Sequence, residues 1–163
     1  MNCTIRYADN QELNSLLPQL YEILYTEMHQ YLPTGSYEEG YSSWKSCMSI
    51  DMQDRARKLV LLYDGDTLIG FFKYSIHDQA FTMEEIQFRE AYRGQGLFQQ
   101  LYRQIIKELP DTLLYVEANT YKQNYKTQAI LEHLGLSIIG ENKSGLSYCY
   151  RGEYKVFAEH FRE

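Results

Sequence analysis

Residues Glu84–Leu101 read EEIQFREAYRGQGLFQQL, a β-strand pattern, a basic loop with two glycines, and then a helical pattern from Leu97. A glycine-rich turn before a helix exposes backbone N–H groups that have no acceptor within the helix. The helix N-terminus adds partial positive charge, so such a turn binds anions. The stretch therefore predicts a pyrophosphate-binding turn, to which Arg93 adds a full charge.

Other phosphate-binding motifs do not fit this stretch. No Lys-Ser or Lys-Thr pair follows the glycines, as a nucleotide P-loop requires, and Gln99 stands where GxGxxG has its third glycine. Two glycines before a helix also occur in a plain turn without a ligand. Taken alone, the turn leaves both interpretations open.

The composition is typical of a soluble globular chain of about one domain. The 163 residues are 44% hydrophobic and 23% charged, with a net charge of −6. This charge argues against a nucleic-acid partner, because phosphate backbones require clustered Lys and Arg. It weakly favours a cationic ligand, although many soluble proteins are acidic for solubility alone.

Three cysteines (Cys3, Cys47 and Cys149) are too scattered for a disulfide framework or a zinc site. Free thiols fit a reducing compartment. Charged residues precede any apolar run at the N-terminus, unlike a signal peptide, and no apolar stretch approaches the ~20 residues of a membrane-spanning helix. We expect a cytoplasmic protein with no metal and no membrane partner.

The remaining periodicities predict alternating helices and strands. Up to Phe88 we expect a strand at Thr4–Tyr7 and then a helix from Leu13 to Met28, which Asp9 or Asn10 caps and Pro18 kinks or restarts. A loop at Leu32–Gly40, a helix at Ser43–Ala56, and strands at Leu59–Tyr63, Leu68–Ile76 and Phe81–Phe88 follow. From Gly96 onward we expect a helix at Gly96–Leu109, a strand at Thr112–Ala118, a helix at Lys126–Leu134 ended by Gly135, and strands at Leu136–Ile139 and Ser147–Tyr150. This order predicts one α+β domain over residues 1–163, with three α/β/α layers: a mixed, mostly antiparallel central sheet and helices on both faces.

Two motifs carry a resemblance to a known family: Arg93-Gly94-Gln95-Gly96, after Ala91-Tyr92 and a strand ending in Phe88, and Asn124-x-x-Thr127-x-x-x-Leu131-Glu132-x-x-Gly135-Leu136. The first resembles the coenzyme A loop of the GNAT (Gcn5-related) N-acetyltransferases, and the second resembles the late helix motif of that family. The order of elements matches across nearly the whole chain. The resemblance implies a GNAT fold and transfer of an acetyl group from acetyl-coenzyme A to a primary amine of a small molecule or peptide.

The resemblance also implies where the cofactor binds. Backbone amides from Gly94 to Phe98 would hold the pyrophosphate, and main-chain groups of Ile86–Phe88 would pair with the pantetheine arm where two strands separate. Asn124 would bond the pantetheine or cap its helix. The expected cofactor-binding residues are Ile86, Gln87, Phe88, Arg93, Gly94, Gln95, Gly96, Leu97, Phe98 and Asn124.

Two departures from the family pattern bear on the chemistry. Phe98 stands where the family often has Gly or Ala, but its amide can still donate a hydrogen bond. Many family members carry a tyrosine in the late helix that protonates the departing thiolate, and Leu131 occupies that position. The usual general acid is therefore missing.

Acetyl transfer requires a neutral amine. An alkylamine with a pKa of about 10 lies roughly three units above neutral pH, a gap of ~4 kcal/mol. A carboxylate, directly or through water, can take the proton as the amine attacks. Glu84 and Glu85 lie on opposite faces of the strand that enters the loop, because strand side chains alternate. Glu84 shares its face with Ile86 and Phe88, where partial burial would raise its pKa. The Glu-Glu-Ile-x-Phe run also resembles the acidic pair of polyamine-type family members, in which a matching glutamate is the base.

Glu84 is the first candidate for the catalytic base, and Glu85 and Glu117 are alternatives; each can also belong to an ordinary ion pair. For the acid, Tyr125 and Tyr121 lie in or beside the loop before the late helix, and solvent can also protonate the thiolate.

The acceptor site is expected between the first two helices and the separating strands. This region is aromatic, and the same residues can equally serve packing: Tyr25, His29, Tyr31, Tyr37 and Trp44. Small amines, amino sugars, polyamines and peptide N-termini all stay open as acceptors. Two other functions stay open: a GNAT-like module that binds acyl-coenzyme A without turnover, and an interaction domain that binds none. Family members are often dimers, so a homodimer is also open.

Overall fold

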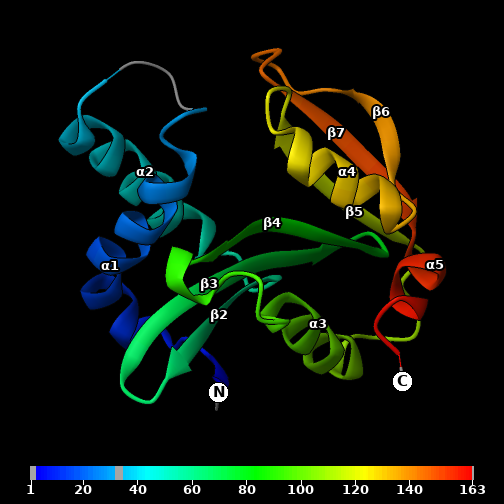
Figure 1. Cartoon of the computed structure of the whole chain (residues 1–163), viewed down its shortest axis with the longest axis horizontal. Coiled ribbons are helices and arrows are strands. Elements are labelled where there is room, and N and C mark those ends of the chain that lie inside the picture. The colour runs from blue at the N-terminus through cyan, green and yellow to red at the C-terminus, as the bar shows by residue number, and fades with distance from the viewer. Residues whose placement is uncertain (1–2, 32–34, 163) are drawn as a thin grey trace. The chain divides into compact units, whose positions relative to one another are not determined.

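The computed structural model describes residues 3–31 and 35–162 (Figure 1). The chain divides into two compact units, Met1–Tyr74 with Glu85–Gln95, and Ser75–Glu84 with Gly96–Glu163. The single domain expected over residues 1–163 stays a prediction. Among the described residues, none of the helices combines the length and the apolar character that crossing a membrane requires.

The first unit contains two helices and the first strands of the sheet: β1 (Cys3–Tyr7), α1 (Asn10–Met28), α2 (Tyr37–Asp51), β2 (Arg57–Asp64) and most of β3 (Thr67–His77). β1 pairs antiparallel with β2, from Cys3↔Asp64 to Tyr7↔Val60. α1 begins as the sequence predicts. The Asp9 carboxylate accepts a hydrogen bond from the Glu12 N–H at 2.8 Å, and Glu12 accepts from the Asp9 N–H at 3.1 Å.

Of the two effects expected at Pro18, a kink or a restart of the first helix, the restart is wrong. α1 runs from Asn10 to Met28 with Pro18 inside it. A proline removes one helical hydrogen bond and frees a carbonyl. Pro18 and Asn14 both lie on the exposed side of α1, so water can satisfy the freed carbonyl. The opposite face is fully buried at Leu17 and Leu20, which stabilises the helix across the proline.

The second helix begins six residues earlier than expected, at Tyr37, and ends at Asp51 rather than Ala56. Ser36 caps it, since its hydroxyl accepts from the Glu39 N–H at 3.1 Å. This Ser-x-x-Glu signal lay inside the stretch that we expected to be a loop, Leu32–Gly40, of which residues 32–34 lie outside the described part of the chain.

The second unit contains the start of β4 (Ala80–Phe88) and all elements from α3 onward: α3 (Leu97–Glu108), β5 (Tyr115–Tyr121), α4 (Tyr125–His133), β6 (Ser137–Glu141), β7 (Ser147–Glu153) and α5 (Tyr154–Glu159). β5 begins three residues later than expected. α5 was not expected, although Tyr154, Phe157, Ala158 and Phe161 recur at helical spacing and are all buried.

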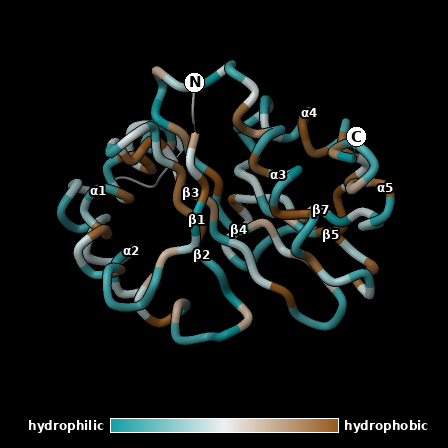
Figure 2. Tube along the Cα trace, turned by 90° about the horizontal axis from the view of Figure 1, so that it is seen from below, coloured by the Kyte–Doolittle hydropathy of each residue, from teal (hydrophilic) through white to brown (hydrophobic). Residues whose placement is uncertain are grey.

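The strands follow the order β1-β2-β3-β4-β5-β7-β6. β4 and β5 are parallel, whereas β1–β2, β5–β7 and β6–β7 are antiparallel. β5 buries alternate residues, Val116, Ala118 and Thr120, and Figure 2 shows apolar stretches where β5 and β7 are labelled. This open, mixed and mostly antiparallel sheet, with five α-helices in the described part of the chain, confirms the α+β fold class.

Candidate active site

Side chains of the first unit hold the loop that follows β4. Its first part is a 3₁₀ turn, Glu90–Tyr92. Arg89 donates from Nε to the Leu68 carbonyl at 2.7 Å and from Nη1 to Glu22 at 3.1 Å. The Tyr92 hydroxyl donates to Asp64 at 2.9 Å, and this hydrogen bond raises the pKa of Tyr92. The loop is thus tied to α1, β2 and β3.

Arg93 is held in the same way. Its Nη1 lies 2.7 Å from the Glu27 carboxylate. Its Nε and Nη2 donate to the Phe88 carbonyl at 3.2 and 2.9 Å. The charge that the sequence assigned to the pyrophosphate is therefore balanced by Glu27, and the guanidinium fixes the loop to the last residue of β4.

Two left-handed glycines complete the turn. Gly94 has φ +74° and Gly96 has φ +77°, a region that side chains disfavour. Gly96 is the N-cap of α3 and supplies no side-chain cap, and the Gln100 N–H donates to its carbonyl at 3.1 Å. The amides of residues 97–99 thus precede the first helical bond. A Cβ at Gly94 or Gly96 would meet no atom within 4 Å, so the space beside each of these two glycines is open.

The parallel pairing of β4 with β5 is short. It runs from Ala80↔Tyr115 to Met83↔Ala118, and β4 then continues to Phe88. The residues expected to pair with pantetheine, Ile86–Phe88, lie beyond this ladder.

The three candidate bases differ in their surroundings. Glu84 follows the last residue of the ladder directly, and both Glu84 and Glu85 are half-buried. Glu117 pairs with Thr82, so alternation places Glu117 and Glu84 on one face of the sheet. Glu117 accepts from Arg151 at 3.2 Å, an ion pair of the kind that the sequence left open.

Residues at the start of α4 have separate roles. The Asn124 side chain accepts from the Thr127 N–H at 3.2 Å and so caps the helix, while its amide nitrogen has no hydrogen-bond partner among the described residues. Tyr125, the candidate acid, is 74% exposed. Leu131 is buried.

A model of the acetyltransferase (GNAT) family matches residues 17–136, which include both motifs and parts of both units. The chain belongs to the GNAT acetyltransferase family. No curated protein matches this GNAT chain.

Solved structures of other acetyltransferases share its fold. The PaiA N-acetyltransferase of Thermoplasma acidophilum, solved with coenzyme A, has a TM-score of 0.71 and 17% identity over 94% of this chain and 100% of its own. The spermidine N-acetyltransferase of Vibrio cholerae, solved with coenzyme A and spermine, has a TM-score of 0.64 and 14% identity over 95% and 97%. The ribosomal-protein-S18-alanine N-acetyltransferase of Escherichia coli has a TM-score of 0.60 and 17% identity over 93% and 94%.

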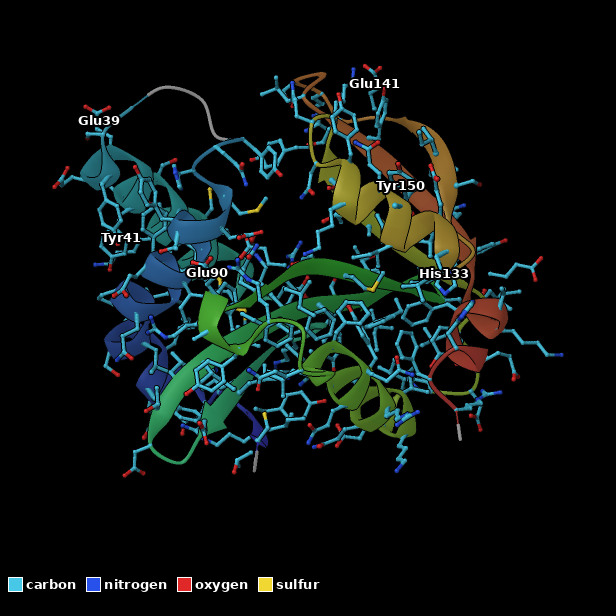
Figure 3. The ribbon with its side chains drawn as sticks, in the orientation of Figure 1. Glu39, Tyr41, Glu90, His133, Glu141 and Tyr150 are labelled. Carbon is cyan, nitrogen blue, oxygen red and sulfur yellow. The ribbon has the colours of Figure 1, made fainter. Side chains whose placement is uncertain are left out.

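The aromatic residues of α1 and α2 form one cluster in the first unit of this GNAT protein. Tyr21 lies at its centre, with ring centroids at 5.0 Å from Tyr37, 5.4 Å from Tyr41 and 5.4 Å from Trp44. Figure 3 labels Tyr41 beside α1 and α2. Tyr25, Tyr41 and Trp44 pack against the buried core, which supports the packing interpretation of the aromatic residues.

Sequence reasoning did not single out one buried tyrosine. Tyr150 on β7 is 1% exposed, and its hydroxyl has no hydrogen-bond partner among the described residues. Burial raises the pKa of this hydroxyl. Figure 3 labels Tyr150 where α4 and β7 meet. No local sequence signal distinguishes it from the other tyrosines of the chain, which has sixteen in all.

Proposed function

We propose that this GNAT protein transfers the acetyl group of acetyl-coenzyme A to a primary amine of a small molecule or peptide, by direct attack in a ternary complex. The turn at Gly94 and Gly96 carries the proposal. Two left-handed glycines, open space beside them and an uncapped helix N-terminus are what a pyrophosphate needs in order to approach backbone amides.

The other cofactor contacts in this proposal involve the end of β4 and the side chain of Asn124. We assign the pyrophosphate to the amides of Gly94–Phe98 and the pantetheine arm to main-chain groups of Ile86–Phe88, beyond the β4–β5 ladder. The amide nitrogen of Asn124, which has no partner within residues 3–31 and 35–162, can donate to a carbonyl of that arm. When bound, the cofactor supplies the activated acetyl thioester.

Glu84 is the base in this proposal. It lies one residue beyond the ladder, whereas Glu117 lies within the ladder and forms an ion pair with Arg151. A carboxylate there takes the amine proton, directly or through a water molecule, as nitrogen attacks the thioester carbon. Glu85 is the alternative on the other face of the strand.

The acceptor is an amine in this proposal because its relatives acetylate amines: their names specify spermidine, an aminoglycoside and a ribosomal-protein alanine. The net charge of −6 favours a cationic acceptor. A cytoplasmic location, where reduced thiols persist, is part of the same proposal.

The alternative is a module that binds acyl-coenzyme A without turnover, and Leu131, buried at the position of the family's acid, favours it. A panel of polyamines, amino sugars, aminoglycosides and peptides, each mixed with acetyl-coenzyme A and read by release of free thiol, separates the two. We expect at least one amine to release thiol and Glu84→Gln to lower kcat about 100-fold or more. Cofactor binding with no thiol release from any amine would establish the non-catalytic module.

A further inference from the structure

Gln87 on β4 carries a mostly buried amide in the first unit. Its exposed fraction is 9%, and its side chain makes no hydrogen bond to residues 3–31 or 35–162. The amide is not among the fully enclosed atoms that lack a partner in that part of the chain, so it borders space that solvent reaches. An amide has two N–H donors and an accepting carbonyl, and leaving them unpaired in a mostly buried position costs stability. A ligand with matching groups would offset that cost.

The Gln87 side chain projects to the face of the strands that α1 and α2 cover. A Cβ at Gly70 would lie 2.7 Å from the ring of Phe88, so Gly70 and Phe88 share one face. Their neighbours Phe71 and Gln87 therefore share the other face, because side chains alternate along a strand. Phe71 is fully buried in the core that α1 and α2 form with β2 and β3.

Arg89 indicates the same direction from a different contact. It lies two residues after Gln87, so alternation places both side chains on one face of β4. The Arg89 guanidinium reaches Glu22 on α1 at 3.1 Å. The Gln87 amide thus faces the region between α1 and β4, where the sequence predicted the acceptor site.

The charged side chains between α1 and the end of β4 are paired with one another. Arg89 pairs with Glu22 at 3.1 Å, and Arg93 pairs with Glu27 at 2.7 Å. Recognition of a polycation requires carboxylates that are not already engaged by arginine. These two carboxylates are engaged, whereas the amide of Gln87 is neutral and has no partner in the described part of the chain. The chemistry of this face therefore favours an acceptor with polar uncharged groups beside a single amine.

The main chain and the side chain at position 87 are available to different ligands. We assign the pantetheine arm to main-chain groups of Ile86–Phe88, and such groups form their hydrogen bonds in the plane of a sheet. Side chains stand roughly perpendicular to that plane. An acceptor that approaches from the α1 side thus meets the Gln87 amide next to the arm that carries the thioester.

We propose that the Gln87 side chain selects the N-terminal amine of a peptide as the acceptor; this rests on the proposed acetyl transfer. The Gln87 carbonyl accepts from the amine, and its NH2 group donates to the carbonyl of the first peptide bond. An extended residue presents its own N–H and C=O on the same side, as in an antiparallel ladder. A polyamine or alkylamine has only methylene groups beside its amine and leaves the NH2 group unpaired.

The reaction on such an acceptor gives an N-acetylated peptide and free coenzyme A. The amine nitrogen bonds to the acetyl carbon and gives up one proton to the base. The C–S bond breaks with its electron pair on sulfur, and sulfur takes one proton from solvent. Gln87 exchanges no proton in this scheme, because its role is to hold the amine and the adjoining carbonyl.

Two acceptors test the assignment: a short peptide with a free N-terminus, and an alkylamine of the same length in which methylenes replace the first peptide bond. Release of free thiol gives kcat/KM for each acceptor with the wild type and with Gln87→Met, which has a similar length but no amide. The ratio of kcat/KM for the peptide to that for the alkylamine should be about tenfold lower in the variant. Comparing this ratio between the two proteins cancels the different basicity of the two amines.

Gln19→Met is the matched control, since Gln19 is an exposed glutamine on α1. It should leave the ratio unchanged. Calorimetry should give the same Kd for acetyl-coenzyme A with the wild type, Gln19→Met and Gln87→Met. Weaker cofactor binding by Gln87→Met alone would assign the side chain to the cofactor and overturn the proposal.

Gln87→Asn keeps the amide but withdraws it by one methylene group, so it should lower the same ratio and serves if Gln87→Met does not fold. An unchanged ratio in a folded variant overturns the role of Gln87 and leaves the acetyl transfer intact. Thiol release with polyamines or amino sugars but not with peptides also overturns it. Cofactor binding without thiol release from any amine contradicts the acetyl transfer itself, and this proposal with it.

Discussion

Arg93 in the loop after β4 and Glu27 on α1 form an ion pair of 2.7 Å between Nη1 and Oε2. The same guanidinium holds the Phe88 carbonyl, so one side chain links the end of β4, the loop and α1 in the first unit. The pair places a carboxylate charge close to the turn to which we assign a pyrophosphate. This arrangement fixes the loop but opposes an anion.

Replacing Glu27 by Gln should therefore strengthen cofactor binding. The amide can still accept from Arg93, while the loss of one negative charge at a partly exposed site changes the interaction energy by up to about 1 kcal/mol. We expect the Kd for acetyl-coenzyme A to fall about two- to fivefold at low salt, measured by calorimetry. The gain should shrink in 0.5 M salt, where charges are screened within a few ångströms. Glu38→Gln, the same change in the first turn of α2, should have little effect, and weaker binding by Glu27→Gln would contradict the prediction.

Gly40 in α2 should resist substitution by alanine. Alanine favours a helix over glycine by about 1 kcal/mol. A Cβ at Gly40, however, would overlap the hydroxyl of Tyr21, which is 3% exposed and ringed by other aromatic side chains. Overpacking of this kind costs about 1–3 kcal/mol, so Gly40→Ala should lower the free energy of unfolding in urea.

A double-mutant cycle identifies the cause of that loss. Tyr21→Phe removes the overlapping hydroxyl, and the next ring atom lies at an ordinary 3.5 Å from the added Cβ. In the Tyr21→Phe background, Gly40→Ala should therefore be neutral or stabilising. A destabilisation of equal size in both backgrounds would show that the hydroxyl is not the cause.

Acid should weaken the start of α1 through Glu12. A hydrogen bond from Arg6, with Nη1 at 2.6 Å from Oε1, lowers the pKa of Glu12 below its unfolded value. The ionised form is thus favoured in the folded state, and this stabilisation is present above the unfolded pKa and lost as pH falls through the folded one.

We expect Glu12→Gln to lower the free energy of unfolding at pH 7 by about 0.5 kcal/mol, since the pair is partly exposed and Gln retains the capping box. The difference in the free energy of unfolding between variant and wild type should vanish well below pH 4, as measured by urea unfolding at pH 7 and at such a low pH. A difference that persists at low pH would assign the effect to packing rather than to charge.

Local signals in the sequence predicted much of the fold. Asp9 and Glu12 mark the start of α1, and Asp64-Gly65-Asp66 marks the connection of β2 to β3. The start of α2 was missed because Ser36, its cap, lies in a stretch rich in proline and glycine. α5 was missed although its apolar spacing is helical.

The candidate site, too, has features that local sequence signals predicted and features that they did not. The glycine turn is local, so the sequence predicted its position directly before α3, whereas anion binding by this turn stays a prediction. The partner of Arg93 on α1 and the burial of Tyr150 on β7 depend on contacts between residues far apart in the chain. No spacing within a single segment encodes such contacts, so sequence reasoning placed Arg93 on the phosphate and overlooked Tyr150.

The most direct test of the central claim is a calorimetric titration of the wild-type protein with acetyl-coenzyme A, alongside Gly96→Asp and the control Gly65→Asp. Both glycines have positive φ and open space around them, so both variants add the same charge and comparable backbone strain. We predict micromolar binding by the wild type and by Gly65→Asp, and loss of binding by a folded Gly96→Asp. Absence of binding to the wild type at millimolar cofactor, or equal binding by all three proteins, would contradict the assignment of the glycine turn as the cofactor site.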